Sequence, residues 1–157
     1  MSNITLYRHA LSGHSHRAQL LLSLLGLDAT LVDVDLAAGE HKQAAFLAKN
    51  RFGQVPVLED GAAVIADSNA ILVYLALQYD ASRTWLPVDP LAAAEVQRFL
   101  STAAGQIASG PAAARLVNVF GAALDHQRAV AVAHNVLSVL ESHLDGREWL
   151  VGNKPTI

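Results

Sequence analysis

The sequence predicts an α/β domain followed by an all-helical region. Over residues 4–79, strand-like runs alternate with helical periodicities in the order β-α-β-α-β-β-α. That order is typical of a mixed four-stranded sheet with helices packed on it. From residue 91 onward the chain is rich in alanine and reads as helix. Residues 80–90 contain prolines and aspartates without periodicity, so we predict a domain over 1–79, a linker over 80–90 and a helical domain over 91–157.

The first half of the α/β domain contains two strands and two helices. Residues 4–7 form a short strand-like run. In residues 18–25 the apolar side chains recur at i, i+3, i+4 and i+7, which predicts a helix that Gly26 ends. Residues 32–36 alternate apolar and acidic side chains, which predicts a strand with one solvated face. A short helix is predicted over 41–49.

The second half of the α/β domain begins with a strand that contains a proline. We predict a strand over 55–58, a turn over 59–61, a returning strand over 62–65 and a helix over 71–79. Proline has no N–H to donate to a ladder, so Pro56 must lie at a strand start, an edge or a bulge. An X-Pro peptide bond at such a place can be cis.

The helical region is predicted to contain a broken helix and an unbroken one. One helix begins at Pro90, because proline suits the first turn. Gly110 and Pro111 should break or kink it, with Ser109 able to cap the second piece. The apolar stripe over residues 129–144 predicts the other helix.

Composition excludes several classes of protein. The 157 residues are 52% apolar and 16% charged, and the net charge of −3 includes no basic block, so nucleic acid is not the expected partner. The absence of cysteine excludes disulfides, thiolate metal sites and a Cys-x-x-Cys redox pair. No apolar run reaches the ~18 residues of a membrane span, and no signal peptide is recognisable. We therefore expect a cytoplasmic protein with no membrane partner.

Three residues with capping side chains stand in a row at the start of the helix predicted over 71–79. Asp67, Ser68 and Asn69 bring together a hydroxyl, free backbone N–H groups and the positive end of a helix dipole, which suits a carboxylate. The negative charge of Asp67 suits an ammonium group. Both groups on one carbon describe the α-end of an amino acid, and the backbone of Val55 could pair with an extended peptide. The alternative is an ordinary edge strand followed by an ordinary cap.

Several histidines raise the question of a metal site. His9, His14, His16 and His41 have no acidic companion at the spacing of metal ligands. We therefore predict no metal.

Several stretches together resemble the cytosolic glutathione S-transferases of the bacterial, theta-like, serine-using type. They are "ITLYRHALSGHSHRAQLLLSLLGL", "GEHKQAAFLAKN", "FGQVPVLEDGAAVIADSNAILVYLA" and "REWLVGNKPTI". The Val-Pro and Asp-Ser pairs, at this separation and in this strand order, are the specific part. The resemblance implies a thioredoxin-like N-terminal domain followed by an all-α C-terminal domain, with glutathione as co-substrate.

The resemblance also implies the residues that hold glutathione. The backbone of Val55 pairs with the cysteinyl part, and Pro56 is the family's cis proline. Asp67 and Ser68 hold the γ-glutamyl ammonium and carboxylate. The glycyl carboxylate is held by a further group of polar residues. These are His41, Lys42 and, as a neighbouring contact, Gln54.

A hydroxyl near the end of the first strand is needed to activate the glutathione thiol. A free thiol has a pKa of ~8.5, so a hydrogen bond that favours the thiolate is required at neutral pH. Ser12 matches the position of the family's serine, and Ser15 and Tyr7 are the alternatives. His14 stands where relatives tend to carry asparagine, so the sequence departs here from the family's pattern of polar contacts near the thiol.

The resemblance implies a function, a partner and a difference in length. The expected function is attack of the glutathione thiolate on small hydrophobic electrophiles. The alternatives are another glutathione-dependent reaction (isomerase, dehalogenase or peroxidase) and a non-catalytic glutathione-binding module. Family members are usually two-fold dimers, so a homodimer is expected. Their helical domain normally continues beyond residue 157, so we expect an incomplete helical domain, whether natural or truncated.

Overall fold

The computed structural model describes residues 4–157, and these form two compact units. One unit extends to Arg83 and the other runs from Thr84 to Thr156. The division falls inside the predicted linker, residues 80–90. The first domain was predicted to start at residue 1, and residues 1–3 lie outside the described residues. The two units are described separately below.

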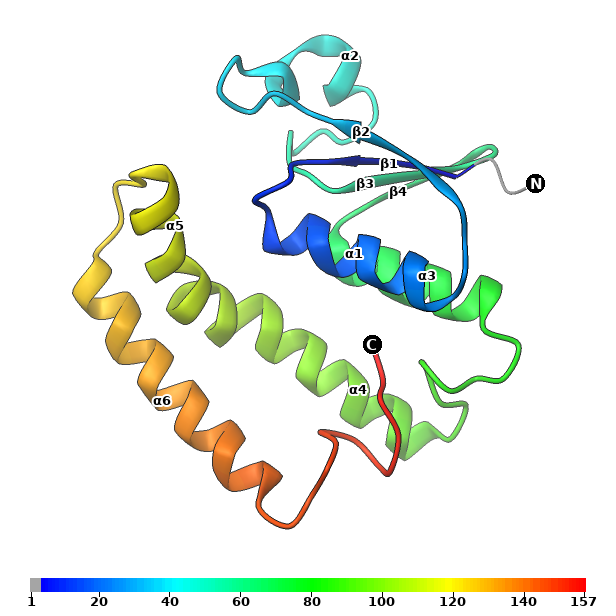
Figure 1. The fold of residues 1–157 in the computed structure, drawn as a ribbon, viewed down its shortest axis with the longest axis vertical. Coiled ribbons are helices and arrows are strands. Elements are labelled where there is room, and N and C mark those ends of the chain that lie inside the picture. Colours follow the sequence, from blue (N-terminus) through cyan, green and yellow to red (C-terminus); the bar gives the residue numbers. More distant parts are fainter. Residues whose placement is uncertain (1–3) are drawn as a thin grey trace. The chain divides into compact units, whose positions relative to one another are not determined.

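The first unit contains a mixed four-stranded sheet, as predicted (Figure 1). The strands lie in the order β2-β1-β3-β4. β2 runs parallel to β1, whereas β3 pairs antiparallel with both β1 and β4. The strand bounds are β1 Ile4–Arg8, β2 Ala29–Asp33, β3 Val57–Asp60 and β4 Ala63–Ala66.

Helices cover both faces of this sheet. α1 (Gly13–Leu24) and α3 (Ser68–Tyr79) lie side by side on one face, and α2 (Ala44–Leu47) lies on the other, after a 3₁₀ turn over Glu40–Lys42 (Figure 1). Alternate residues of a strand point to opposite faces, so the sheet has a core on each side. The larger core includes Leu6, Leu21, Ile71 and Leu75, and the smaller is formed by Val34, Phe46 and Val57.

Two strand predictions need correction. The strand predicted over 32–36 is β2, which lies at residues 29–33. Val34 still donates its backbone N–H to Arg8 O at 2.8 Å and is buried, but the chain then turns. The strand predicted over 55–58 begins at residue 57, because the Val55-Pro56 peptide is cis and precedes the ladder.

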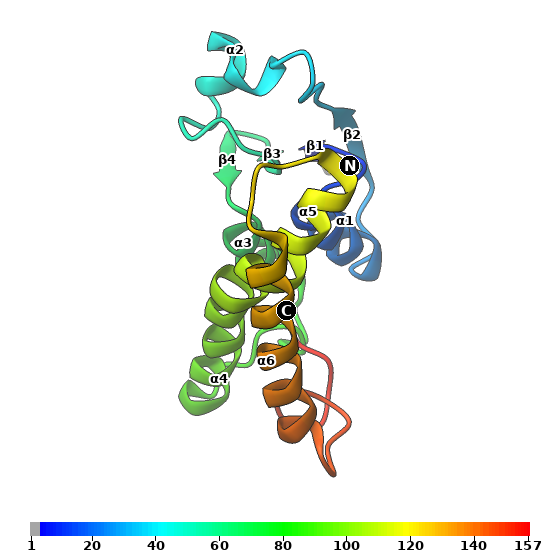
Figure 2. The ribbon, with the colours of Figure 1, turned by 90° about the vertical axis from the view of Figure 1, so that its left-hand side faces the viewer.

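The second unit is built from helices that begin at aspartate caps. α4 (Pro90–Thr102) starts at the predicted proline, and the Asp89 carboxylate accepts a hydrogen bond from Ala92 N. α6 (His126–Leu144) starts at Asp125, which accepts from Arg128 N in the same way. Each cap satisfies a backbone donor that the helix itself leaves without a partner. α6 packs against residues 103–112, which continue the helix after α4, and the two stretches of helix run side by side (Figure 2). Within residues 4–157, none of the helices is both long and apolar enough to cross a bilayer.

Of the predicted break or kink at Gly110 and Pro111, the break does not occur. The helix continues through both residues as a π-helical segment over 103–112 and then as α5 (Ala113–Phe120). The wider π turn keeps backbone bonds around the proline, for example from Ala113 N to Ala108 O. Ser109 does not cap a second piece, because its hydroxyl donates to Gly105 O at 2.9 Å.

Gly110 is required by the packing of α6 on the π-helical segment. A Cβ atom at this position would lie 2.9 Å from Ala133 N and 3.1 Å from Ala133 Cα. These are backbone atoms of α6, so they cannot move aside without shifting the helix. Gly105 lies in the same segment, but a Cβ there would meet nothing within 4 Å.

We expect Gly110→Ala to destabilise the second unit by roughly 1–3 kcal/mol, because the added methyl overpacks a helix-helix contact. Gly105→Ala is the matched control and should be neutral or stabilising by up to about 1 kcal/mol, since alanine favours helix over glycine. Denaturant unfolding of both variants measures the difference. Equal stability of the two variants would contradict the close approach at Gly110.

Candidate functional site

Three connecting segments of the first unit lie at the same edge of the sheet. Two of them follow β1 and β4, and the third precedes β3. The strand register places Tyr7 opposite Val57, and Val57 opposite Ala66. The residues that follow β1 and β4 and those that precede β3 therefore lie together. The predicted residues Ser12, Val55, Pro56, Asp67 and Ser68 all belong to these three segments.

Ser12 lies at the N-terminus of α1. It is the N-cap residue, and its Oγ accepts a hydrogen bond from Ser15 N at 3.2 Å. The side chain is half-buried. Because the oxygen only accepts in this contact, the hydroxyl hydrogen can be donated elsewhere.

The two alternatives to Ser12 have structural contacts of their own. Ser15 is buried, and its Oγ accepts from His9 N at 3.2 Å, which holds the loop between β1 and α1. The Tyr7 hydroxyl donates to the Glu59 carboxylate at 2.9 Å. Lys49 pairs with the same carboxylate and holds the pKa of Glu59 below its ordinary value. Ser15 is thus buried and the Tyr7 hydroxyl hydrogen is already donated, whereas the half-buried Ser12 keeps its hydroxyl hydrogen for another acceptor.

Asp67 has an unusual backbone conformation at the start of α3. Its φ of +80° lies in a region that non-glycine residues seldom occupy. Its Oδ1 accepts from Asn69 N at 2.8 Å and from Ala70 N at 3.0 Å. Asp67 thus caps α3 and presents an exposed negative charge at the same point.

Ser68 is buried and lies against two basic side chains of α1. The Arg17 guanidinium donates from Nη2 to Ser68 Oγ, and His14 Nδ1 lies 3.1 Å from the same oxygen. Burial lowers the pKa of Arg17, and the nearby Asp67 opposes that effect. Sequence analysis did not identify Arg17 as a site residue. The available signal was the i, i+3 spacing of His14 and Arg17, which places both on one helix face.

The residues predicted to hold the glycyl end of glutathione are connected by hydrogen bonds to the loop before β3. Lys42 Nζ donates to Gly53 O at 3.0 Å, and Asn50 Nδ2 donates to Gln54 O at 2.9 Å. Gly53 has φ +56°, and a Cβ there would lie 2.7 Å from His41 O. Glycine at this position lets residues 41–42 approach the segment that leads to Val55.

Two side-chain nitrogens at this edge are buried without a partner. Arg17 Nε and His41 Nδ1 have no hydrogen-bond partner within residues 4–157. A buried polar atom without a partner is unfavourable, so the guanidinium suits a ligand that brings an acceptor, and the imidazole suits a ligand with a polar group that can pair with Nδ1. Arg17 Nε belongs to the segment around Ser68, and His41 Nδ1 belongs to the segment around Lys42. The residues therefore fit an extended molecule with a polar group at each end.

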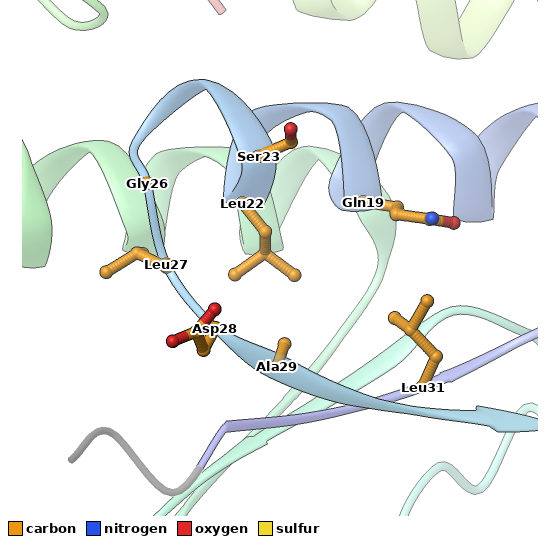
Figure 3. A pocket seen from close by; sticks show the side chains of 8 residues that line it. All are labelled: Gln19, Leu22, Ser23, Gly26, Leu27, Asp28, Ala29 and Leu31. Atoms are coloured by element: carbon orange, nitrogen blue, oxygen red, sulfur yellow. The ribbon is translucent and has the colours of Figure 1, made fainter.

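A metal site and the pocket beside α1 have less support as functional sites. In the part of the chain that the structure describes, no three His, Cys, Asp or Glu side chains cluster as metal ligands. A pocket of about 350 Å³ lies between the C-terminal half of α1 and β2 (Figure 3). Asp28 is the one titratable residue among those that line it. Ser12 and Ser68 do not line it.

Comparisons of sequence identify relatives of this chain. Residues 2–77 match the family model for the glutathione S-transferase N-terminal domain. Glutathione S-transferase 3 of Zea mays is 36% identical over 168 residues, which cover 100% of this chain and 74% of that protein. Glutathione S-transferase theta-2 of Homo sapiens is 34% identical over 97 residues, which cover 62% of this chain and only 40% of that protein.

Solved structures show the same fold. A glutathione transferase homolog from Drosophila mojavensis with bound glutathione matches 99% of this chain and 72% of its own, with a TM-score of 0.90 and 27% identity. Glutathione transferase E6 from Drosophila melanogaster matches 98% of this chain and 71% of its own, with a TM-score of 0.90 and 30% identity.

The sheet order and the cis proline before β3 define a thioredoxin-like domain, followed in this chain by a helical region. With the matches over the full length of the chain, they show that it belongs to the glutathione S-transferase family. Members of this family use glutathione as co-substrate.

We expect Asp67→Ala to lower the free energy of unfolding by at least about 1 kcal/mol, because α3 loses its cap and alanine tolerates the positive φ poorly. Asp67→Asn should stay within about 0.5 kcal/mol of the wild type, because asparagine caps equally well and has nearly the same size and shape as aspartate. Urea unfolding measures both. Asp125→Ala removes an ordinary cap from α6 and is the reference for cap loss alone. If Asn and Ala were equally destabilising at position 67, capping would not be the contribution of Asp67.

Proposed function

We propose that the chain binds glutathione along the edge formed by β1, β3 and β4 and catalyses attack of its thiolate on small hydrophobic electrophiles. The observation that carries the proposal is the convergence of Ser12, the cis Val55-Pro56 peptide and the Asp67–Ser68 cap at that edge. Relatives named as glutathione transferases and a similar structure with bound glutathione support it.

The γ-glutamyl end of glutathione would lie at the start of α3. Its carboxylate meets the Ser68 hydroxyl and the guanidinium of Arg17, at the positive end of the helix dipole. Its ammonium group meets the exposed carboxylate of Asp67. Arg17 Nε then gains the acceptor that the protein itself does not supply.

The rest of the tripeptide would extend across the edge. The backbone of Val55, which precedes the ladder that begins at Val57, pairs with the cysteinyl part. The glycyl carboxylate reaches His41 and Lys42, beside the exposed side chain of Gln54. The buried His41 Nδ1 is an available partner there.

Ser12 would stabilise the thiolate by donating its hydroxyl hydrogen to the sulfur. Lowering a thiol pKa by about two units requires roughly 2.7 kcal/mol, at ~1.36 kcal/mol per unit. A hydrogen bond to a charged group supplies about 1.5–3 kcal/mol, and the N-terminus of α1 adds to it. The thiol proton is lost to solvent, so no general base is required. The thiolate then forms the new S–C bond with the electrophile; on an aryl halide the C–halogen bond breaks and the halide leaves with its electron pair.

We expect Ser12→Ala to shift the acid limb of the pH–rate profile upward by about one to two units, because the bound thiol loses the hydrogen bond and returns toward its free pKa. At pH 6.5 the turnover of an activated aryl halide should then fall about five- to fiftyfold, in proportion to the thiolate fraction. Steady-state kcat/KM between pH 5.5 and 9 measures the shift.

Tyr7→Phe is the control for Ser12→Ala. It removes the hydroxyl that donates to Glu59, so it should change stability and leave the acid limb of the profile in place. A profile that moves in Tyr7→Phe but not in Ser12→Ala would show that Ser12 is the wrong hydroxyl. Retention of wild-type protein on immobilised glutathione tests binding without assuming a reaction.

We also propose that the protein is a cytoplasmic homodimer of the theta-like, serine-using type. Several large apolar side chains are exposed, including Phe52 at 81%, Val88 at 78% and Leu91 at 74%. A two-fold dimer would bury surface of this kind.

A dimer would have a mass of about twice the 16.6 kDa chain. Light scattering at micromolar concentration should give that mass. Because helix α3 carries both the γ-glutamyl site and the exposed Leu77, loss of the dimer should also weaken glutathione binding. A monomer that binds glutathione with undiminished affinity would contradict this coupling.

A further inference from the structure

Three polar atoms form a closed triangle at the junction of α1 and α3. His14 Nδ1 lies 3.1 Å from Ser68 Oγ, and Arg17 Nη2 lies 3.4 Å from His14 Nδ1. The third side is the hydrogen bond from Arg17 Nη2 to Ser68 Oγ. Ser68 is buried, so its hydroxyl has few directions in which to donate.

The number of hydrogens in this triangle limits what Ser68 can offer to a ligand. Arg17 can only donate, and its N–H occupies one lone pair of Ser68 Oγ. When His14 is neutral and Nδ1 is unprotonated, Nδ1 accepts one hydrogen bond, for which the Ser68 hydroxyl and an N–H of Arg17 Nη2 compete. The shorter distance, 3.1 Å against 3.4 Å, favours the Ser68 hydroxyl as the donor. In that state Ser68 has no hydrogen to donate to a carboxylate.

Protonation of His14 reverses this arrangement. Nδ1–H then donates to Ser68 Oγ, which accepts from both His14 and Arg17. The hydroxyl hydrogen is released and can be donated to a carboxylate at the N-terminus of α3. The imidazolium adds a second positive charge beside Arg17, which further favours an anion.

The charges around His14 oppose protonation until an anion arrives. The charged groups that face it are Arg17 on its own helix and Asp67 at the start of α3. Partial burial and Arg17 lower the pKa of His14, and Asp67 opposes them. A carboxylate bound against Arg17 and Ser68 would offset the charge of Arg17, so the pKa of His14 should rise when the ligand binds.

We propose that the γ-glutamyl carboxylate of glutathione binds together with a proton taken up by His14, which turns the Ser68 hydroxyl toward the ligand. His14 is thus a positioning residue that acts through Ser68, and the inference rests on the proposed glutathione site. The consequence is an affinity for the glutathione backbone that rises as the pH falls from 8 to 6.

S-methylglutathione is the probe, because it keeps the γ-glutamyl end and has no thiol to ionise. Calorimetric titrations between pH 6 and 8, in buffers with different enthalpies of ionisation, measure the protons taken up on binding. The wild type should take up a fraction of one proton, and its affinity should rise up to about tenfold from pH 8 to pH 6, which corresponds to a one-unit increase in the His14 pKa.

Two variants separate His14 from the other histidines. His14→Asn keeps a polar side chain that does not titrate, so proton uptake should disappear and the pH dependence should flatten. His16→Asn changes an exposed histidine on the same helix and should behave as the wild type. Equal uptake by the wild type and His14→Asn would overturn the inference and leave the glutathione site intact. If the wild type does not bind S-methylglutathione at any pH, both the site and the inference fail.

A measurement on the wild-type protein covers the case in which His14→Asn does not fold. NMR titration of the His14 imidazole, with and without saturating S-methylglutathione, reports its protonation directly. We expect the midpoint to rise on saturation. An unchanged midpoint, or one that falls, would refute proton-linked binding at Ser68.

Discussion

The alignment of Tyr7, Val57 and Ala66 across three neighbouring strands determines where the site can form. β1 and β3 are antiparallel, so the residues after one and before the other emerge at the same edge. β4 returns to that edge and leads directly into α3. The loops therefore need no strong contacts with one another to converge, because the hydrogen bonds of the sheet already bring their ends together.

Two helix N-termini meet at this edge, which suits a ligand with more than one negative group. α1 begins beside Ser12 and α3 begins at Ser68, and His14 joins the two starts through its contact with Ser68. Each N-terminus carries a partial positive charge and backbone donors. A thiolate near one and a carboxylate near the other would both be stabilised. The two helix N-termini thus support both steps of the proposed function, the binding and the activation of glutathione.

Residues in the core have favourable conformations and contacts. Several residues at the edge have an unfavourable backbone conformation or a buried polar atom without a partner. Leu6, Ile71 and Leu75 are fully buried apolar residues with ordinary surroundings. At the edge, Asp67 has a positive φ, and Arg17 Nε is buried without an acceptor among the described residues. Such departures are unfavourable in isolation and tend to collect at functional sites. Their concentration here is an argument for a site that does not depend on the family's name.

The features that the sequence by itself determined are those that depend on residues a few positions apart. The start of a helix at Pro90, the mixed sheet and the helix N-terminus at Ser68 could be predicted because caps, turns and periodicity act locally. The roles of Ser12, Lys42 and Val55 came from resemblance to a family and stay predictions.

Only the tertiary structure decided the features that depend on what lies opposite in space. Arg17 reaches Ser68 across 51 positions of the chain, and the need for glycine at position 110 arises from Ala133 in another helix. The helix also continues through Pro111, in a π-helical segment that packs on α6. That packing partner is distant in the sequence. Local sequence patterns reflect the conformational preferences of each residue and its near neighbours. They do not show which distant atoms the fold brings into contact with it.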